Sequence, residues 1–340
     1  MRIESFKAGK GFRLLEFLAL ALLLNAVPLA AQEVHPRIIS LYAAHTEVLL
    51  RLGAKDNIIG VSAQETYSGP EAEGWNPPVF TIHDDVEKFL AAKPDLVLVR
   101  PMHMAAGSRL VSSLKTAGIK VHSEQVLKAG DLYKYWRNLA ALVGRQAEVE
   151  KMIINFDQQI SIYHEAAQRR PEEAKPTIFL EAIHNQVKTF TPDSLPVWLV
   201  ELAGGRNVAA DAKAHAKGLM VTDYGPERLL AKAKEIDIFI SQAGPMNNST
   251  LKQIKSREIY KPIRAFKDGR VYKIPEELLS RPTPSLIKGL EELAALTGLD
   301  AEIASGQRLE QNESEPAAAG ENQRSANVDE EIKANLPPEN

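Results

Sequence analysis

Apolar and polar positions along residues 37–127 predict strands and helices in alternation. The segments "RIISLYA" and "IIGVSA" are short apolar runs typical of buried strands, and "HTEVLLRLGA" between them has helical apolar spacing. A Gly- and Pro-rich loop, "SGPEAEGWNPP", precedes the helix and strand "VEKFLAAKPDLVLVR", after which come the helix "SRLVSSLKTAG" and the strand "IKVHSE". This alternation predicts a parallel sheet covered on both faces, so we expect residues 34–128 to form one α/β lobe.

The alternation restarts after Pro176 and predicts a second α/β lobe over residues 175–303. Its segments are the strand "TIFLEAI", the helix "SLPVWLVELAGG", the helix and strand "PERLLAKAKEIDIFI", a helix around "TLKQIKS", the strand "GRVYKIP" and the helix "PSLIKGLEELAALTG". Residues 226–240 repeat the pattern of residues 86–100 with a shift of 140 positions, which pairs Glu87 with Glu227 and Asp95 with Glu235.

Residues 131–170 predict one long helix between the two lobes. The segment has no proline before Pro171, one internal glycine, and apolar residues at helical spacing, with Asp131 as a candidate N-cap. A straight helix of this length reaches on the order of 55 Å, more than the width of one domain. We therefore expect two Rossmann-like lobes joined by a single long α-helix.

The two ends of the chain differ from this pattern. Within residues 1–31, Lys7, Lys10 and Arg13 precede an apolar run at residues 14–24, and small residues follow around Ala30 and Ala31, as in a cleaved secretory signal peptide. The run is shorter than the roughly 20 residues of a membrane-spanning helix. Residues 304–340 are rich in Glu, Asn, Ala, Ser and Pro, and predict a disordered acidic tail.

Composition narrows the classes of protein. The 340 residues are 44% apolar and 25% charged, with a formal net charge of −3, which gives no reason to expect a nucleic-acid partner. The chain has no cysteine, so it forms no disulfide and offers no cysteine for a lipid after the signal peptide. We expect a free periplasmic protein rather than a lipoprotein.

Five segments together resemble a known family. They are "RIISLYAAHTEVLLRLGAKDNIIGVS", "VEKFLAAKPDLVLV", "LVELAGGRNVAADA", "PERLLAKAKEIDIFIS" and "FKDGRVYKIPEELLSRPTPSLIKGLEELA". In order and spacing they are similar to the periplasmic binding proteins of ABC importers for iron chelates and cobalamin. The resemblance implies two lobes on a rigid helix with the ligand between them, and a solute-binding protein rather than an enzyme. It also implies delivery to an inner-membrane permease dimer with a cytoplasmic ATPase.

The resemblance assigns a role to the repeated acidic residue. In this family an acid on each lobe, in the helix before a sheet strand, docks into arginine pockets of the permease, and the matching positions here are Glu87 and Glu227. Two equivalent sockets suit two equivalent carboxylates, because Arg pairs bidentately with carboxylate. The alternative is that both acids only favour the first turn of a helix through its dipole.

Candidate ligand-binding residues follow the predicted strands, because ligands of doubly wound sheets bind beyond the carboxyl ends of the strands. Each residue has a structural alternative: His45 as a helix cap, for instance, or Arg281 as the partner of a nearby glutamate. Trp198 faces either the cleft or the core. The predicted set is Tyr42, His45, Gln64, Tyr67, His83, Met102, His103, His184, Met220, Gln242 and Arg281.

Four of these residues are candidate axial ligands for a metal carried by the bound molecule: His45, His83, His103 and His184. Only Arg100 and Arg281 are obvious partners for an anionic chelate, which favours haem or a corrinoid over a siderophore. No HExxH motif is present, and the histidines lie far apart in the sequence, so no dedicated protein metal site is expected. We expect no cofactor, and a transported ligand that contains iron or cobalt.

Two other classes of function are weighed against transport. An enzyme is disfavoured because the sequence has no GxSxG, P-loop or GxGxxG motif, and the glycines of "ELAGGRNVA" follow a helix, where they suit a C-cap. A sensor or adaptor would use the same two lobes to report the ligand to a receptor. Binding of another kind of metal complex is also open.

Overall fold

The computed structural model describes residues 36–104, 108–214 and 218–305. The predicted signal peptide and residues 306–340 of the predicted tail lie outside these ranges. Residues 299–305 are helical, so the expected start of the tail at residue 304 falls inside a helix. In the part of the chain that is described, no helix is both long and apolar enough to cross a membrane. The described residues from Arg37 to Ser305 belong to one compact unit.

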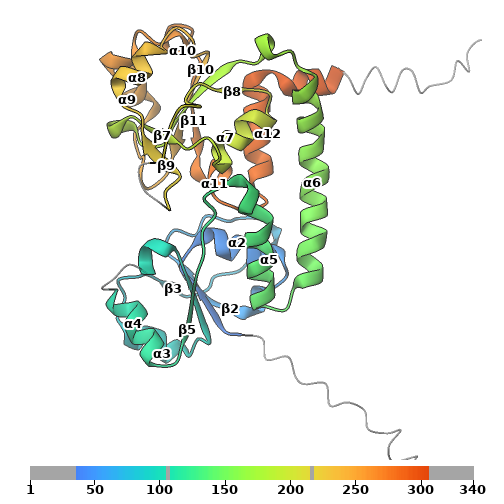
Figure 1. Ribbon diagram of the computed structural model, residues 1–340. Coiled ribbons are helices and arrows are strands. Elements are labelled where there is room, and N and C mark those ends of the chain that lie inside the picture. Colours follow the sequence, from blue (N-terminus) through green and yellow to red (C-terminus); the bar gives the residue numbers. More distant parts are fainter. Residues whose placement is uncertain (1–35, 105–107, 215–217, 306–340) are drawn as a thin grey trace, which may run out of the picture. The chain divides into compact units, whose positions relative to one another are not determined.

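The first lobe, which carries the labels β2, β3 and β5 in Figure 1, is built on a five-stranded parallel sheet in the order β3-β2-β1-β4-β5. Strand β1 lies in the middle, pairs with β2 on one side and with β4 on the other, and both pairings are parallel. This strand order is that of a doubly wound sheet. The elements are β1 (Ile38–Ser40), α2 (Ala43–Arg51), β2 (Ile58–Ser62), β3 (Val79–Phe80), α3 (Val86–Ala92), β4 (Leu96–Val99), α4 (Arg109–Thr116) and β5 (Lys120–Ser123).

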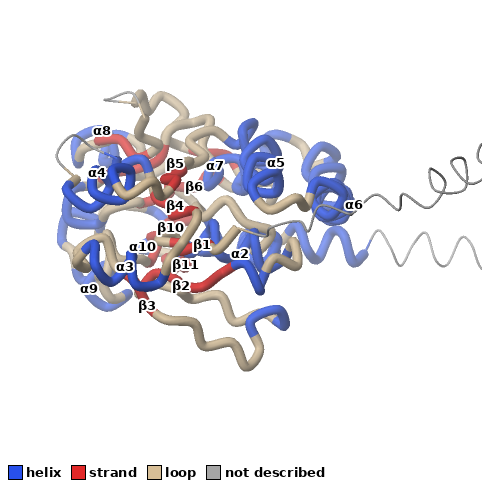
Figure 2. Tube along the Cα trace, turned by 90° about the horizontal axis from the view of Figure 1, so that it is seen from below, coloured by secondary structure: helices blue, strands red, loops and turns tan. Residues whose placement is uncertain are grey.

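The second lobe has a four-stranded parallel sheet in the order β11-β10-β6-β8. Strands β7 and β9 form a separate antiparallel pair, which the alternating pattern did not predict. The strands are β6 (Thr177–Glu181), β7 (Lys188–Phe190), β8 (Arg206–Asn207), β9 (Val221–Asp223), β10 (Ile238–Ala243) and β11 (Val271–Pro275). The helices are α7 (Leu195–Leu202), α8 (Pro226–Ala231), α9 (Leu251–Ser256), α10 (Arg264–Lys267), α11 (Glu276–Leu279) and α12 (Leu286–Thr297). Figure 2 shows the strands between two groups of helices.

The predicted helix over residues 131–170 is wrong as a single element. The segment forms two helices that pack on each other, α5 (Leu132–Leu142) and α6 (Gln146–Arg169). Between them Gly144 has a φ of 68°, the left-handed conformation in which glycine often ends a helix. Helix α6 alone is the long connecting helix, and its 24 residues span about 36 Å.

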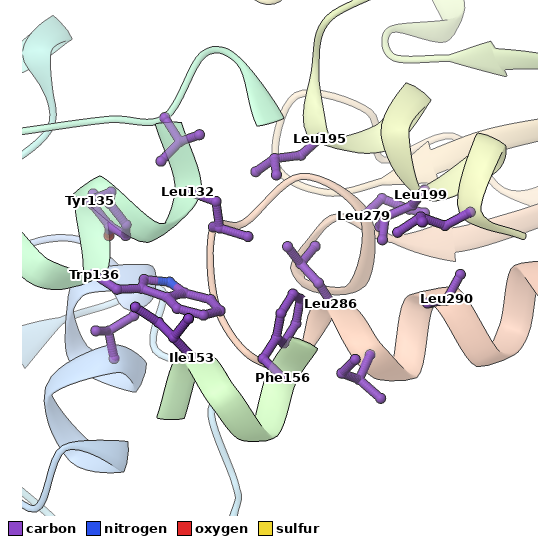
Figure 3. Close-up of a cluster of buried hydrophobic side chains, with 14 of the residues drawn as sticks. Leu132, Tyr135, Trp136, Ile153, Phe156, Leu195, Leu199, Leu279, Leu286 and Leu290 are labelled. Atoms are coloured by element: carbon purple, nitrogen blue, oxygen red, sulfur yellow. The ribbon is translucent and has the colours of Figure 1, made fainter. Parts of the chain in front are cut away.

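One hydrophobic core connects α5 and α6 to both lobes. Figure 3 shows Trp136 of α5, Phe156 of α6 and Leu286 of α12 converging on the same space. The rings of Trp136 and Phe156 meet edge to face with centroids 5.0 Å apart. The Nε1 of Trp136 donates a buried 2.8 Å hydrogen bond to the carbonyl oxygen of Pro282. Helix α5 therefore packs with the first lobe through α2 and bonds to the second through Pro282.

The repeated helix and strand occupy equivalent places in the two sheets. In the first lobe the Asp95 carboxylate accepts the backbone N–H of Arg37, just before β1, at 2.8 Å. In the second, Asp237 accepts the backbone N–H of Thr177, at the start of β6, at the same distance. Asp95 therefore corresponds to Asp237, and the pairing with Glu235 is wrong, because the second copy has two more residues between its helix glutamate and this aspartate.

Candidate functional site

The carboxyl ends of the two sheets are joined by a direct hydrogen bond. Arg281, which follows β11 and α11, donates from Nη1 to the hydroxyl of Thr66, which follows β2, at 2.6 Å. Its Nη2 lies 2.9 Å from an oxygen of Glu276, the residue directly after β11. The two strand edges that a doubly wound fold uses for ligands thus meet at Arg281.

Tyr42 and Arg100 mark the point in the first sheet where the strand order reverses. Tyr42 follows β1 and Arg100 follows β4, and the guanidinium carbon of Arg100 lies 5.0 Å from the centroid of the Tyr42 ring. Burial raises the pKa of Tyr42, while Arg100 and Arg281 act in the opposite direction. The crevice between two such strands is the usual ligand position in this type of sheet.

Several buried polar atoms at these strand ends have no hydrogen-bond partner among the described residues. Buried polar groups are normally paired, so a group of unpaired atoms at one edge is the pattern expected where a ligand or water binds. The atoms at the meeting edges are Nε of Arg100, Nε of Arg281, Nδ1 of His103, Oε2 of Glu65 and Oε1 of Gln242.

His103 is the histidine best suited to meet a ligand. It lies in a short 3-10 helix after β4 and is half-buried. Burial, together with the positive charge of Arg100 and the proximity of His83, lowers its pKa. Its imidazole is therefore neutral at neutral pH, the form that binds a metal ion. His83 itself is exposed at the end of the loop before α3.

His45 is not available as a ligand-binding residue, contrary to the prediction. It lies in the first turn of α2, is fully buried, and its Nε2 is 3.2 Å from the carbonyl oxygen of Glu124. Its ring packs against those of Tyr42 and Tyr135. Burial lowers its pKa to about 3. His45 is a core residue beneath Tyr42, because the apolar face of α2 turns it inward.

His184 also lies in the interior, and its predicted role as an axial ligand stays a prediction that would use its Nε2. Its Nδ1 lies 3.0 Å from both oxygens of Glu181, a fully buried carboxylate at the end of β6. The hydroxyls of Ser241 and Tyr260 donate to the same carboxylate, and Arg257 donates to the hydroxyl of Tyr260. This network occupies the His184 nitrogen that faces Glu181 and links β6, β10 and the segment after α9.

The remaining predicted residues have mixed environments. Gln64 and Met102 are exposed, Met220 and Gln242 are half-buried, and Gln242 lies in β10. Tyr67 is half-buried and donates to Glu71, and its ring lies 5.2 Å from the guanidinium carbon of Arg51. Trp198 packs against the core that α6 contributes to, with its ring stacked on Phe156, so it does not face the cleft.

Sequence reasoning missed Glu65, Thr66 and Glu276 as parts of this edge. Glu276 follows the strand β11 directly, and a charged residue at that position is a signal that could have identified it. Glu65 and Thr66 adjoin the predicted Gln64, and the irregular loop hides which of the three turns inward. Across residues 36–104, 108–214 and 218–305, no three His, Asp or Glu side chains are grouped so as to hold a metal ion.

Glu87 and Glu227 occupy matching positions. Each lies in the first turn of its helix, α3 and α8 respectively, and each is exposed. Within the described structure neither carboxylate has a hydrogen bond or an ion pair. A helix between parallel strands runs antiparallel to them, so its first turn lies towards the carboxyl edge of the sheet.

Two parallel α/β lobes, one long connecting helix and polar groups where the sheet edges meet define a two-lobed binding protein. The family model described as periplasmic binding protein matches residues 38–278. The chain therefore belongs to the periplasmic binding protein family.

Curated relatives and solved structures agree with this family. The ABC transporter substrate-binding lipoprotein YvrC of Bacillus subtilis (strain 168), itself uncharacterized, is 26% identical over 260 residues, 76% of this chain and 78% of that protein. The vitamin B12-binding protein of Vibrio vulnificus (strain YJ016) is 23% identical over 282 residues, 82% of this chain and 96% of the relative. The apo form of the periplasmic heme-binding protein RhuT from Roseiflexus sp. RS-1 has a TM-score of 0.62 at 19% identity, and the match covers 77% of this chain and 98% of that one. This structural likeness confirms the predicted fold.

Proposed function

We propose that the protein is the solute-binding component of an ABC importer, which captures a metal-bearing organic ligand between its lobes and delivers it to an inner-membrane permease. The family match supports binding rather than catalysis. The observation that carries the proposal is the hydrogen bond from Arg281 to Thr66, which joins the ligand-binding edges of the two sheets. Around it lie buried polar atoms that have no partner among the described residues.

The ligand is haem, a corrinoid or an iron-siderophore complex, so it carries iron or cobalt. Relatives named for vitamin B12 and a structural neighbour named for heme support this class. Arg100 and Arg281 suit an anionic group on the ligand, because guanidinium pairs well with carboxylate or phosphate. His103 is the candidate axial ligand from the protein, and His83 lies near it.

Delivery uses Glu87 and Glu227. Both carboxylates are exposed at the first turn of equivalent helices, and neither has a partner in the described residues that would need to be displaced. A permease dimer offers two equivalent sockets, so one carboxylate on each lobe matches its symmetry. Electrostatic complementarity of this kind chiefly affects the rate and specificity of docking.

The protein works in the periplasm, after removal of a signal peptide and without a lipid anchor. The absence of cysteine supports the lipid-free form, although the relative YvrC is named a lipoprotein. The −3 net charge is compatible with a soluble carrier.

Charge reversal tests the delivery step. The double variant Glu87→Arg, Glu227→Arg should abolish ligand uptake by cells, because like charges would then face the permease arginines. Ligand affinity of the purified variant should stay within about twofold of wild type, since both acids are exposed and neither is hydrogen-bonded to a predicted ligand-binding residue in the described structure. Glu165→Arg with Glu173→Arg, at two exposed positions outside these helices, is the matched control and should transport normally. Wild-type uptake by the first double variant would rule out this docking scheme.

A further inference from the structure

A second pocket lies within the first lobe, beside the cleft. It has a volume of about 710 Å³ and is formed only by residues between Val61 and Val79, that is, by the end of β2, the long loop after it and the start of β3. No residue of the second lobe lines it. The pocket is therefore complete without the residues that join the two lobes.

The lining of this pocket is acidic and aromatic. Glu65 and Glu73 supply carboxylates, Tyr67 and Trp75 supply rings, and the lining contains no Lys, Arg or His. Burial raises the pKa of Glu65, while hydrogen bonds from Tyr67, Thr46 and Thr66 and the positive charge of Arg281 act in the opposite direction. Arg281 itself is bound to Thr66 and Glu276. The electrostatic character of the pocket is thus suited to a cation.

Two buried polar atoms in the lining have no partner among the described residues. Ser62 is only 9% exposed, and its Oγ is unpaired. One carboxylate oxygen of Glu65, Oε1, accepts the backbone N–H groups of Thr66 and Tyr67, each at 3.2 Å, whereas Oε2 is buried and unpaired. A buried acceptor without a donor is costly, so these two oxygens favour a ligand that brings hydrogen-bond donors or positive charge.

The loop is built around the Tyr67 ring. A Cβ on Gly69 would lie 2.0 Å from the Tyr67 hydroxyl oxygen, so a larger residue there would displace the ring. The Tyr67 hydroxyl donates to Glu71, and the guanidinium of Arg51 lies over the ring. The Tyr67 ring is therefore held by Glu71 at its hydroxyl and by Arg51 over its face.

We propose that this pocket binds an organic ammonium group, with Glu65 as its counter-ion, Ser62 as a hydrogen-bond partner and Trp75 as the cation–π partner. The ammonium group belongs either to a free amine or to an arm of the transported molecule. The pocket shares Glu65 and Tyr67 with the candidate ligand site, and the proposal goes beyond the proposed function by adding a preference for an ammonium group.

Calorimetric titration of the purified full-length mature protein with choline chloride tests the charge requirement. The neutral isostere 3,3-dimethylbutan-1-ol is the matched probe, because it has the same shape without the charge. Choline should bind at one site about tenfold or more tightly than the alcohol. Equal affinities for the two probes, or no saturable binding of choline at millimolar concentration, would overturn the proposal.

Variants test the assigned residues. Glu65→Gln should weaken choline binding about tenfold and leave the alcohol almost unaffected, whereas Trp75→Leu should weaken both probes. Asp56→Asn, an exposed acid outside the pocket, is the control and should bind choline as wild type does. A thermal melt of each variant checks folding. If a folded Glu65→Gln protein bound choline with wild-type affinity, Glu65 would not be the counter-ion.

A competition experiment separates the two sources of the amine. Protein preloaded with haem, cobalamin or a ferric hydroxamate is titrated with choline. Loss of choline binding would identify the pocket as a side pocket for an arm of the transported molecule, and unchanged binding would identify a site for a free amine. Binding of choline but of no metal complex would contradict only the transport proposal. Binding of a metal complex but not of choline would contradict only the ammonium-site proposal.

Discussion

Four histidines lie near the carboxyl edges of the strands, yet their environments give them different roles. His45 and His184 are buried and each has one ring nitrogen bonded within the protein, whereas His103 is half-buried and His83 is exposed. Residue type and position relative to the strands identified all four as candidates. Only burial separates them, and burial depends on which face of α2 or of the segment after β6 turns inward.

The pH dependence of stability tests the position of His45. Its pKa is about 3 in the folded protein because of burial, and about 6.5 when unfolded. The unfolded chain therefore binds the proton more tightly than the folded protein. The contribution of neutral His45 to the free energy of unfolding is complete above about pH 6.5 and is lost as the pH falls towards 3. The loss amounts to about 1.4 kcal/mol per pH unit. Urea unfolding between pH 7 and pH 4 measures it.

Two variants complete this test. His45→Gln removes the titrating group but keeps a donor for Glu124, so stability should fall less steeply with acid. His164→Gln, at an exposed position of α6, should keep the wild-type slope. An unchanged slope in His45→Gln would mean that His45 does not stay neutral in the folded protein.

At the scale of elements, periodicity predicted most strands and helices but not the turn at Gly144. The apolar spacing runs on through this turn, because α5 and α6 both bury a face in the same core. The repeated helix and strand were recognised, but the loop between them differs in length, which shifted the pairing from Asp237 to Glu235. Local pattern identifies an element, whereas its ends depend on single backbone positions.

Replacement of glycines tests the turn between α5 and α6. Gly144 has a φ of 68° and open space around its Cα, so Gly144→Ala should destabilise the protein by about 1 kcal/mol through backbone strain alone. Gly130 has equally open space but no positive φ, and Gly130→Ala should change the free energy of unfolding by less than about 0.5 kcal/mol. Equal effects of the two substitutions in denaturant unfolding would argue against a left-handed residue at 144.

At the scale of the whole molecule, the lobes are held by more than α6. Ser285, at the start of α12, donates at 2.5 Å to Glu47 of α2, a carboxylate that is 4% exposed and also bonds to Arg51. With the Trp136–Pro282 bond, this contact fixes the segment after α11 against the first lobe. In both contacts the two partners lie more than 140 residues apart in the sequence, so no local sequence pattern could predict either contact.

The variant Ser285→Ala tests this connection. It removes one donor from the buried Glu47 carboxylate, and the free energy of unfolding should fall by about 1–3 kcal/mol. Ser256→Ala, at an exposed position in α9, should have an effect below about 0.5 kcal/mol. A loss below about 0.5 kcal/mol for Ser285→Ala would show that the contact between the lobes contributes little.

The central claim is that the meeting edges of the two sheets bind a metal-bearing organic ligand. The most direct test is to purify the mature protein from its native host, record its visible spectrum and bound metal, and then titrate the ligand-free protein with haem, cobalamin and a ferric hydroxamate. We expect one of these ligands to bind in a 1:1 complex, with affinity about tenfold or more weaker in Arg281→Gln. A protein that carries no iron or cobalt and binds none of the three ligands would contradict the claim.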